Sequence, residues 1–331
     1  MPKISATSFN VDIRKPLGAV LSSGNTYWVV GDSQYANRFQ FGYGVPLLQT
    51  AAVTTSDNID DPEWDNLRLD LIKARTHQKG LTWVTNNLGL QDDRTGNNNA
   101  NDVTTGDKVL NSVYTKYQTV ASDLLTDKFL VASGEYEDVT PAALSSSSTT
   151  VTFSVRATWQ FTVTWASAAD ANAFFNAGGA YIVGIDASNG IYTGFQRLQS
   201  DAFAVLLSFG NLYGNPSFYT FAAADWYAAA STTGYVWKTA NVADARYSTD
   251  RIDVRVLTST NTIGSSNRLT IRYVLESVYA GGAPSGSGAG AIGYGDSVSL
   301  TLEPLITERR SSNTITSPLP TSYTYGSWSS N

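Results

Sequence analysis

The sequence predicts an α+β protein that is mainly β, with a helical N-terminal region followed by a C-terminal antiparallel β-sandwich with short helical insertions. Apolar residues recur at helical spacing up to about residue 140, and after it the pattern changes to an alternation of apolar and polar residues. The composition agrees, because only 15% of residues are charged while the chain has 18 Tyr and 8 Trp. Such a chain is typical of a β-rich protein whose surface contacts other proteins.

These patterns divide the chain into four regions. They are an N-terminal arm with an amphipathic helix (1–90), a polar loop with a connecting helix (91–140), the β-sandwich domain (141–305) and an extended C-terminal tail (306–331). We expect the arms at 1–60 and 305–331 to thread over neighbouring subunits.

The most sharply defined helix is "EWDNLRLDLIKARTHQKG", residues 63–80. Pro62 suits a first helical turn, and Gly80 is a typical helix end. The helix has one apolar stripe with most charged side chains off it, and the stripe consists of Trp64, Leu67, Leu71 and Ala74. Further helices are predicted over 5–21, with a kink at Pro16, and over 108–130.

The second half of the chain alternates with period two. Residues 150–165 predict two half-buried antiparallel strands joined by a short turn. A short helix over 167–179, a strand at 180–186, a hairpin around "NTIGSS" (261–266) and a last strand at 296–304 complete the expected sandwich.

Two patterns bear on catalysis. "VVGDSQ", residues 29–34, resembles the nucleophile block of GDS-type esterases, but that mechanism needs a histidine base near the serine. The single histidine, His77, lies at a predicted helix end, where it is typical of a group that stabilises the helix dipole or forms a hydrogen bond. We interpret the Gly-Asp-Ser sequence as a turn.

Carboxylate pairs for glycan hydrolysis are the third possibility. The acids of the β region are isolated in the sequence, and they are Asp186, Asp201, Asp225, Asp253, Glu276 and Glu303. We therefore predict a protein that is not an enzyme and that has no catalytic, cofactor or metal site.

Composition also excludes several classes of protein. With no cysteine, the chain cannot use disulfides, thiolate catalysis or cysteine-bound zinc. A net charge of −6 argues against a nucleic-acid binder. No apolar run reaches the length of a membrane helix, so we expect no membrane insertion.

Two segments carry a resemblance to a known family. The positions Trp64, Asn66, Leu67, Arg68, Asp70, Leu71, His77, Gln78 and Gly80, preceded by "FGYG" (41–44), resemble a recurring segment in virion structural proteins of marine, cyanophage-like tailed phages. "DANAFFNAGGAYI" (170–182) is similar to a Phe-Phe-Asn-x-Gly-Gly segment that follows a "TVTW"-like strand in the same proteins. Val45 and Pro46 depart from that family's pattern, in which a glutamine ends the Tyr-Gly block.

The resemblance implies a non-enzymatic structural component of the tail, baseplate or fibre apparatus, located in the virion and assembled in the host cytoplasm. The expected partners are further copies of the chain, such as a trimer, and other virion proteins. We expect the helix at 63–80 to supply the subunit interface through Trp64, Leu67 and Leu71, with Arg68 and His77 as polar anchors.

Two other functions stay open. One is a host-recognition adhesin that binds a surface glycan by stacking sugars on Trp226, Tyr227 and Trp237. The other is a protein that decorates the capsid surface. A glycan hydrolase ranks below both.

Overall fold

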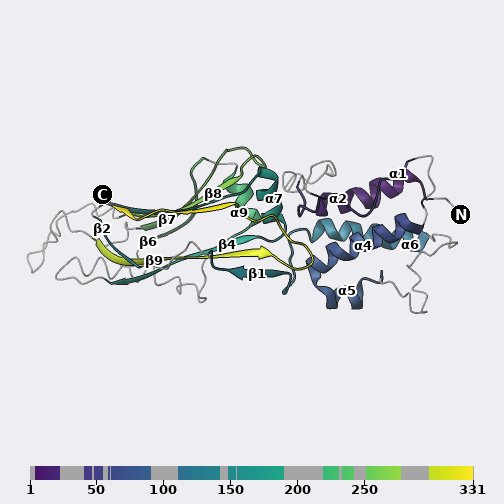
Figure 1. The fold of residues 1–331 in the computed structure, drawn as a ribbon, viewed down its shortest axis with the longest axis horizontal. Coiled ribbons are helices and arrows are strands. Elements are labelled where there is room, and N and C mark those ends of the chain that lie inside the picture. The colour runs from purple at the N-terminus through teal and green to yellow at the C-terminus, as the bar shows by residue number, and fades with distance from the viewer. Residues whose placement is uncertain are drawn as a thin grey trace, which may run out of the picture. The chain divides into compact units, whose positions relative to one another are not determined.

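The computed structural model describes residues 4–22, 41–46, 48–54, 59, 61–90, 111–141, 148–153, 155–189, 219–230, 233–241, 251–276 and 298–330. It confirms the α+β class, with helices first and two antiparallel sheets after them (Figure 1). The chain forms two compact units. The helical unit consists of Met1–Asp138, Ala166–Gly179 and Arg309–Leu319, and the β unit consists of Val139–Trp165, Ala180–Glu308 and Pro320–Asn331.

The described helices of the helical unit come from the first two of its three parts. They are α1 (Ala6–Ser8), η1 (Phe9–Arg14), α2 (Lys15–Leu21), α4 (Asp61–Lys79), α5 (Leu81–Asn87), α6 (Asn111–Thr126) and α7 (Ala168–Asn176). The predicted helix boundaries at 63–80 and 108–130 agree with α4 and α6 to within a few residues.

The predicted kink at Pro16 falls at an irregularity in the helix. The first three elements run on without a break, and η1 is a stretch of π-helix that ends at Arg14, two residues before the proline. Proline lacks an N–H group and its ring collides with the carbonyl one turn earlier in an α-helix. The wider π turn relieves both problems and lets the helix continue.

The core of the helical unit forms where α4 meets the first helices and α6. Trp64 lies between Phe9 and Tyr117, with ring centroids 5.4 and 5.3 Å away and both contacts edge-to-face. Leu67 and Leu71 belong to the same buried cluster. Gly80, at φ +85°, ends α4 and starts α5, as its conformational freedom allows.

The described strands form two sheets. The five-stranded sheet has the order β1 (Tyr136–Val139), β9 (Val298–Ser311), β4 (Ala180–Asn189), β5 (Tyr219–Phe221), with β2 (Thr149–Phe153) also on β9. The six-stranded sheet has the order β10 (Ser322–Tyr325), β3 (Arg156–Thr164), β8 (Arg268–Glu276), β7 (Arg251–Thr258), β6 (Tyr235–Asn241), with β11 (Ser329–Ser330) also on β3. A short helix, α9 (Ala223–Ala229), lies between β5 and β6 in the chain.

The two sheets face each other through aromatic side chains. Phe161 of β3 contacts Tyr181 of β4 at 5.6 Å between ring centroids, and Tyr273 of β8 donates a hydrogen bond to the Gly184 carbonyl of β4 at 3.1 Å. The predicted hairpin around 261–266 is confirmed as β7 and β8. The two strands predicted at 150–165 exist, but they do not pair, since β2 joins β9 and β3 joins β8.

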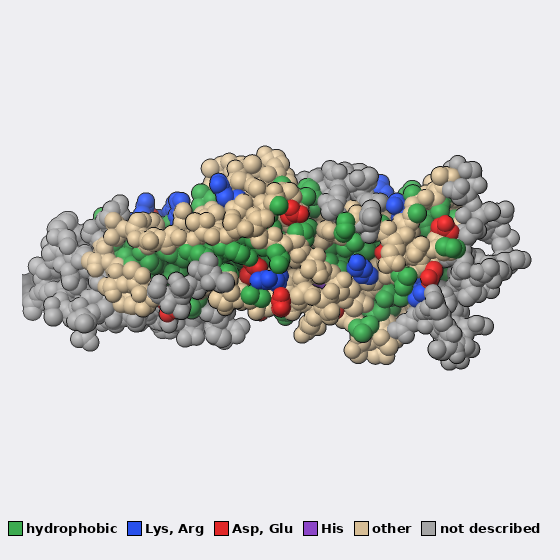
Figure 2. All heavy atoms as spheres, in the orientation of Figure 1, with side chains coloured by type: hydrophobic (Ala, Val, Ile, Leu, Met, Phe, Trp, Pro, Cys, Tyr) green, Lys and Arg blue, Asp and Glu red, His purple; other side chains and the backbone are tan. Residues whose placement is uncertain are grey.

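The C-terminal residues differ from the expected tail. Residues 306–311 finish β9, and β10 and β11 both pair with β3 inside the β unit. At the other end, Phe9 and Ile13 are fully buried in the helical core. The described parts of both predicted arms thus form contacts within the chain itself. On the face drawn in Figure 2, charged side chains are sparse among the described residues, in keeping with the composition.

Candidate functional site

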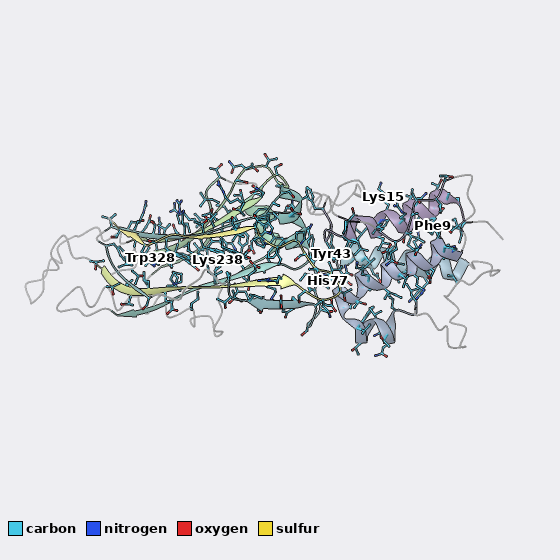
Figure 3. All side chains as sticks on the ribbon, in the orientation of Figure 1. Phe9, Lys15, Tyr43, His77, Lys238 and Trp328 are labelled. Atoms are coloured by element: carbon cyan, nitrogen blue, oxygen red, sulfur yellow. The ribbon has the colours of Figure 1, made fainter. Side chains whose placement is uncertain are left out.

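The segments that carry the resemblance meet inside the helical unit. Tyr43 comes from the "FGYG" segment, and Arg75, His77 and Gln78 come from α4. Asp127 and Lys128 follow α6, and Asn176 of α7 donates a hydrogen bond to the Phe41 carbonyl at 2.6 Å. We call Tyr43, Arg75, His77, Gln78, Asp127 and Lys128 the polar cluster. Figure 3 shows its members Tyr43 and His77 close together at the C-terminal end of α4.

The backbone of residues 41–45 is held against the end of α2. The Tyr43 N–H donates to the Val20 carbonyl and the Val45 N–H to the Leu21 carbonyl, both at 2.8 Å. Gly42 permits this approach, since a Cβ atom there would lie 2.2 Å from the Ser22 carbonyl oxygen. Two carbonyls that α2 leaves unsatisfied at its end thereby gain partners.

Gln78 connects the members of the polar cluster. Its amide nitrogen donates to the Tyr43 hydroxyl and to the Leu124 carbonyl, each at 3.0 Å, and its amide oxygen accepts from Arg75 at 2.9 Å. The Tyr43 hydroxyl donates in turn to the Lys128 carbonyl. Burial raises the pKa of Tyr43 above its usual range, so the phenol keeps its proton.

Two cations share one carboxylate at the edge of the cluster. Asp127 accepts from Arg75 at 2.8 Å and lies 3.0 Å from the Lys79 ammonium group. Burial raises the pKa of Asp127, but the hydrogen bonds from Arg75 and Lys79 outweigh it, and the pKa falls below its usual value. The guanidinium of Arg75 also lies 5.0 Å from the ring centroid of Trp83.

Lys128 is fully buried and is held by backbone carbonyls. Its Nζ atom donates to Ala19 at 2.9 Å and to Phe41 at 2.6 Å. Burial lowers the pKa of Lys128 well below that of an exposed lysine. The side chain therefore joins α2, the 41–45 segment and the end of α6 into one packed group.

His77 is the most buried of the predicted polar anchors, with 0% of its surface exposed. Its ring lies 4.8 Å from that of Tyr43, and neither ring nitrogen forms a hydrogen bond of ordinary geometry, although the Ala177 backbone lies nearby. Burial lowers the pKa of His77 to about 4. The imidazole is neutral at neutral pH and cannot stabilise the helix dipole by charge, which corrects that half of the prediction.

The predicted subunit interface on α4 is also corrected. Trp64, Leu67, Arg68, Leu71 and His77 are each at most 3% exposed within the single chain. The amphipathic stripe is real, but this chain's own helices cover it, and the polar side also packs inward. Arg68, for example, contacts Asp65 at 2.6 Å, and Asp70 accepts from the Thr50 hydroxyl at 2.8 Å.

The predicted sugar-stacking residues are buried as well. Trp226, Tyr227 and Trp237 are at most 7% exposed. Trp226 packs against Trp165 at 6.0 Å, and the Trp237 indole donates to Asp225 at 2.8 Å. A sugar ring needs an open aromatic face, so these three residues form core and not a binding platform.

The acids of the β region show one grouping that sequence spacing did not reveal. Asp253 and Glu276 lie on one face of neighbouring strands, and arginines form ion pairs with both. Burial raises the pKa of each carboxyl group, but the arginines outweigh it and lower the pKa below its usual value. The alternation in "RIDVRV" (251–256) places Arg, Asp and Arg on that face, and this alternation is the sequence signal from which the grouping could be predicted. The Gly-Asp-Ser sequence at 31–33, Asp201 and the Asp186 side chain lie outside the described part of the chain.

The polar cluster holds elements together, and five of its six members are buried, whereas Asp127 keeps 20% of its side chain exposed. Among the described residues, no group of three or more His, Asp or Glu side chains is placed to hold a metal ion. Within the same residues, no helix is long and apolar enough to cross a bilayer. Comparisons of the chain with protein-family models, curated proteins and solved structures found no match.

Proposed function

We propose that this chain is a non-enzymatic structural component of a tailed-phage virion, in the tail, baseplate or fibre apparatus. The observation that carries the proposal is that the segments resembling such virion proteins are those that interlock around Tyr43, His77 and Gln78. A resemblance concentrated in a packing centre points to a shared scaffold and not to a shared reaction.

The chemistry of the cluster supports the same function. Gln78 forms hydrogen bonds through both of its amide atoms, Lys128 binds carbonyls, and Tyr43 donates to the backbone. Each group is engaged in joining one element to another. A base or nucleophile would instead need a face open to substrate.

Contacts with other subunits would then use side chains other than the buried stripe of α4. Leu81, at the first position of α5, is 65% exposed, and Val11, Leu130 and Leu319 of the same unit are also exposed. These side chains replace Trp64, Leu67 and Leu71 as the apolar candidates for subunit contacts in the helical unit.

Mass spectrometry of purified particles tests the location directly. Particles from a host that carries the gene should contain the chain in amounts comparable to other tail proteins. Recovery of the chain only from the soluble lysate would overturn the proposal. Antibody labelling of the head surface instead of the tail would favour the capsid-decoration alternative.

Light scattering coupled to size-exclusion chromatography tests the assembly behaviour. We expect the purified chain to form an oligomer, such as a trimer, and the double variant L81S/L130S to weaken it. The exposed Val155 of the β unit offers a matched control in V155S. A monomer at every concentration, resistant to protease, would contradict a scaffold role.

A further inference from the structure

The six-stranded sheet turns one face away from the sandwich core, and arginine is its dominant charged residue. Along β8, Leu269, Ile271 and Tyr273 are buried in the core, and the alternate positions Arg268, Thr270 and Arg272 are exposed or half-buried, whereas Val274 and Glu276 further along the same face are buried. The register extends this face to β3 and β7. Its charged residues are Arg156, Arg251, Arg255, Arg268 and Arg272, with Asp253 and Glu276 as the acids. We call this surface the arginine face.

The sign of this surface is opposite to that of the protein. The chain carries a net charge of −6, whereas arginines outnumber acids five to two on the arginine face. In Figure 2, Lys and Arg side chains project from the border of the β unit, in the region where Figure 1 labels β7 and β8. A local excess of positive charge on an acidic protein attracts anions selectively to that surface.

At one end of the face the charges are already neutralised. Arg156 and Arg251 flank Glu276 in register from either side, and Arg251 contacts it at 2.7 Å. Arg255 contacts Asp253 at 2.9 Å. Both acids of the face, Asp253 and Glu276, are therefore already engaged by arginines.

Among the residues that the structure describes, the other end of the face has no acid. Arg272 lies directly opposite Arg255 in the β7–β8 register, an arrangement of like charges that destabilises a sheet. Its guanidinium donates to the neutral amide of Gln160 at 3.0 Å. Arg268, four residues along the same strand, is exposed and forms no ion pair with a described residue. An anion bound here would give Arg272 and Arg268 the counter-charge that Arg255 already has in Asp253.

Hydroxyl groups surround these two arginines. Thr162 and Thr270 lie on adjacent strands with their hydroxyl oxygens 2.9 Å apart. Thr324 of β10 pairs in register with Thr162, and Ser322 with Thr164. Side-chain hydroxyls both donate and accept hydrogen bonds, as the hydroxyls of a sugar also do.

We propose that the arginine face binds an acidic polysaccharide, with its carboxylate or sulfate groups on Arg272 and Arg268 and its hydroxyls on the flanking threonines. Four residues of strand separate the two arginines by about 13 Å, so they would engage different acidic groups of one polymer. Guanidinium groups suit this task because they bind carboxylate and sulfate oxygens in a bidentate way.

The same face disfavours a nucleic acid as the partner. Aromatic side chains that could stack on bases lie on the opposite side of the sheet, as Phe161 and Tyr273 do in the core. The chain as a whole also lacks the basic character of a phosphate-backbone binder. A neutral glycan, in turn, would leave the charge of Arg268 and Arg272 unmatched.

Isothermal titration calorimetry tests the proposal, with heparin and with polygalacturonate titrated into the full-length chain. We expect binding to at least one of them, weakening as salt is raised. The variant R268Q/R272Q should lose at least about tenfold in affinity, because two charge-assisted contacts disappear. Its circular dichroism and melting temperature should match those of the wild type, since both side chains lie at the surface.

A matched control separates this site from general charge attraction. K73Q/K116Q removes the same charge from the helical unit and should bind as the wild type does. Three outcomes would each overturn the proposal. They are equal losses of affinity in both variants, failure of the chain to bind heparin and polygalacturonate alike, and tighter binding to double-stranded DNA than to these polymers. The result does not depend on where the chain lies in a particle, so it is separate from the test of the proposed function.

Discussion

At the scale of single residues, His77 shows how burial alone sets the chemistry of a side chain. The imidazole is enclosed by α4, the 41–45 segment and the Ala177 backbone, and no acid of the described residues contacts it to favour its charged form. Protonation would place an uncompensated charge in the core, so the pKa falls to about 4. His77 thus contributes shape and apolar contact at neutral pH.

This pKa predicts a specific pH dependence of stability. Well above pH 6.5 the imidazole is neutral in both the folded and the unfolded chain, and its ionisation contributes nothing to stability. As the pH falls from 6.5 to about 4, the unfolded chain takes up a proton that the folded chain cannot, so the free energy of unfolding decreases, by about 3 kcal/mol in all. Urea denaturation across this range measures the loss.

The variant His77→Met isolates this effect from other titrating groups. Asp127, Asp253 and Glu276 also titrate in acid, but they do so equally in the wild type and the variant. The difference in stability between the two proteins should therefore change between pH 6.5 and 4. A constant difference would show that His77 is protonated with its ordinary pKa in the fold.

At the scale of elements, the 41–45 segment acts as a strap over the end of α2. Its hydrogen bonds to Val20 and Leu21 depend on a close approach of two backbones at Gly42. A Cβ atom at Gly42 would meet the backbone of residue 22, which has no flexible atoms to move aside. The strap therefore tolerates no side chain at this position.

The variant G42A should lower the free energy of unfolding by about 3 kcal/mol or more, because the added methyl group forces the strap off α2. G134A is the matched control. Gly134 has a positive φ of +91° but open space around its Cβ position, so this variant should lose only about 1 kcal/mol. Chemical denaturation compares the two. Similar losses would mean that backbone conformation, and not the close approach, decides the effect.

The elements also show what the sequence could and could not predict. The bounds of α4 follow from local signals, the proline at its start and Gly80 at its end, and both were read correctly. The alternation of β7 and β8 was likewise sufficient to predict a hairpin. Local signals fix an element's kind and ends because they act over a few residues.

What covers an element depends on residues far away in the chain. The stripe of α4 was assigned to a neighbouring subunit because the sequence does not tell an intramolecular partner from an intermolecular one. Tyr117, which packs on Trp64, lies 53 positions later. The polar cluster was missed for the same reason, as Tyr43, Gln78 and Asp127 meet only in the fold.

At the scale of the whole molecule, the C-terminal residues complete the β unit. Tyr323 and Tyr325 of β10 pack on Phe161, and the Tyr323 hydroxyl donates to the buried Glu308 at 2.7 Å. Removing them would expose the Phe161 ring, free the edge of β3 and take a hydrogen-bond donor from a buried carboxyl group.

A chain ending at residue 319 should therefore aggregate or show a much lower melting temperature than the full chain. The matched control is a chain without Asn331 alone, which should behave as the wild type does. Size-exclusion chromatography and thermal denaturation by circular dichroism compare them. Unchanged melting of the shorter chain would restore the interpretation of these residues as a tail free to reach other subunits.

The division of the chain into interleaved units also has a consequence for its synthesis. The helical unit needs Arg309–Leu319 for closure, since the backbone N–H of Thr314 binds the Glu135 carboxylate and Ile315 enters the helical core. Although the ribosome finishes α1 to α6 early, this unit lacks its last segment until residues 309–319 have been synthesised. A product that terminates before residue 309 would leave both units unfinished and open to proteases.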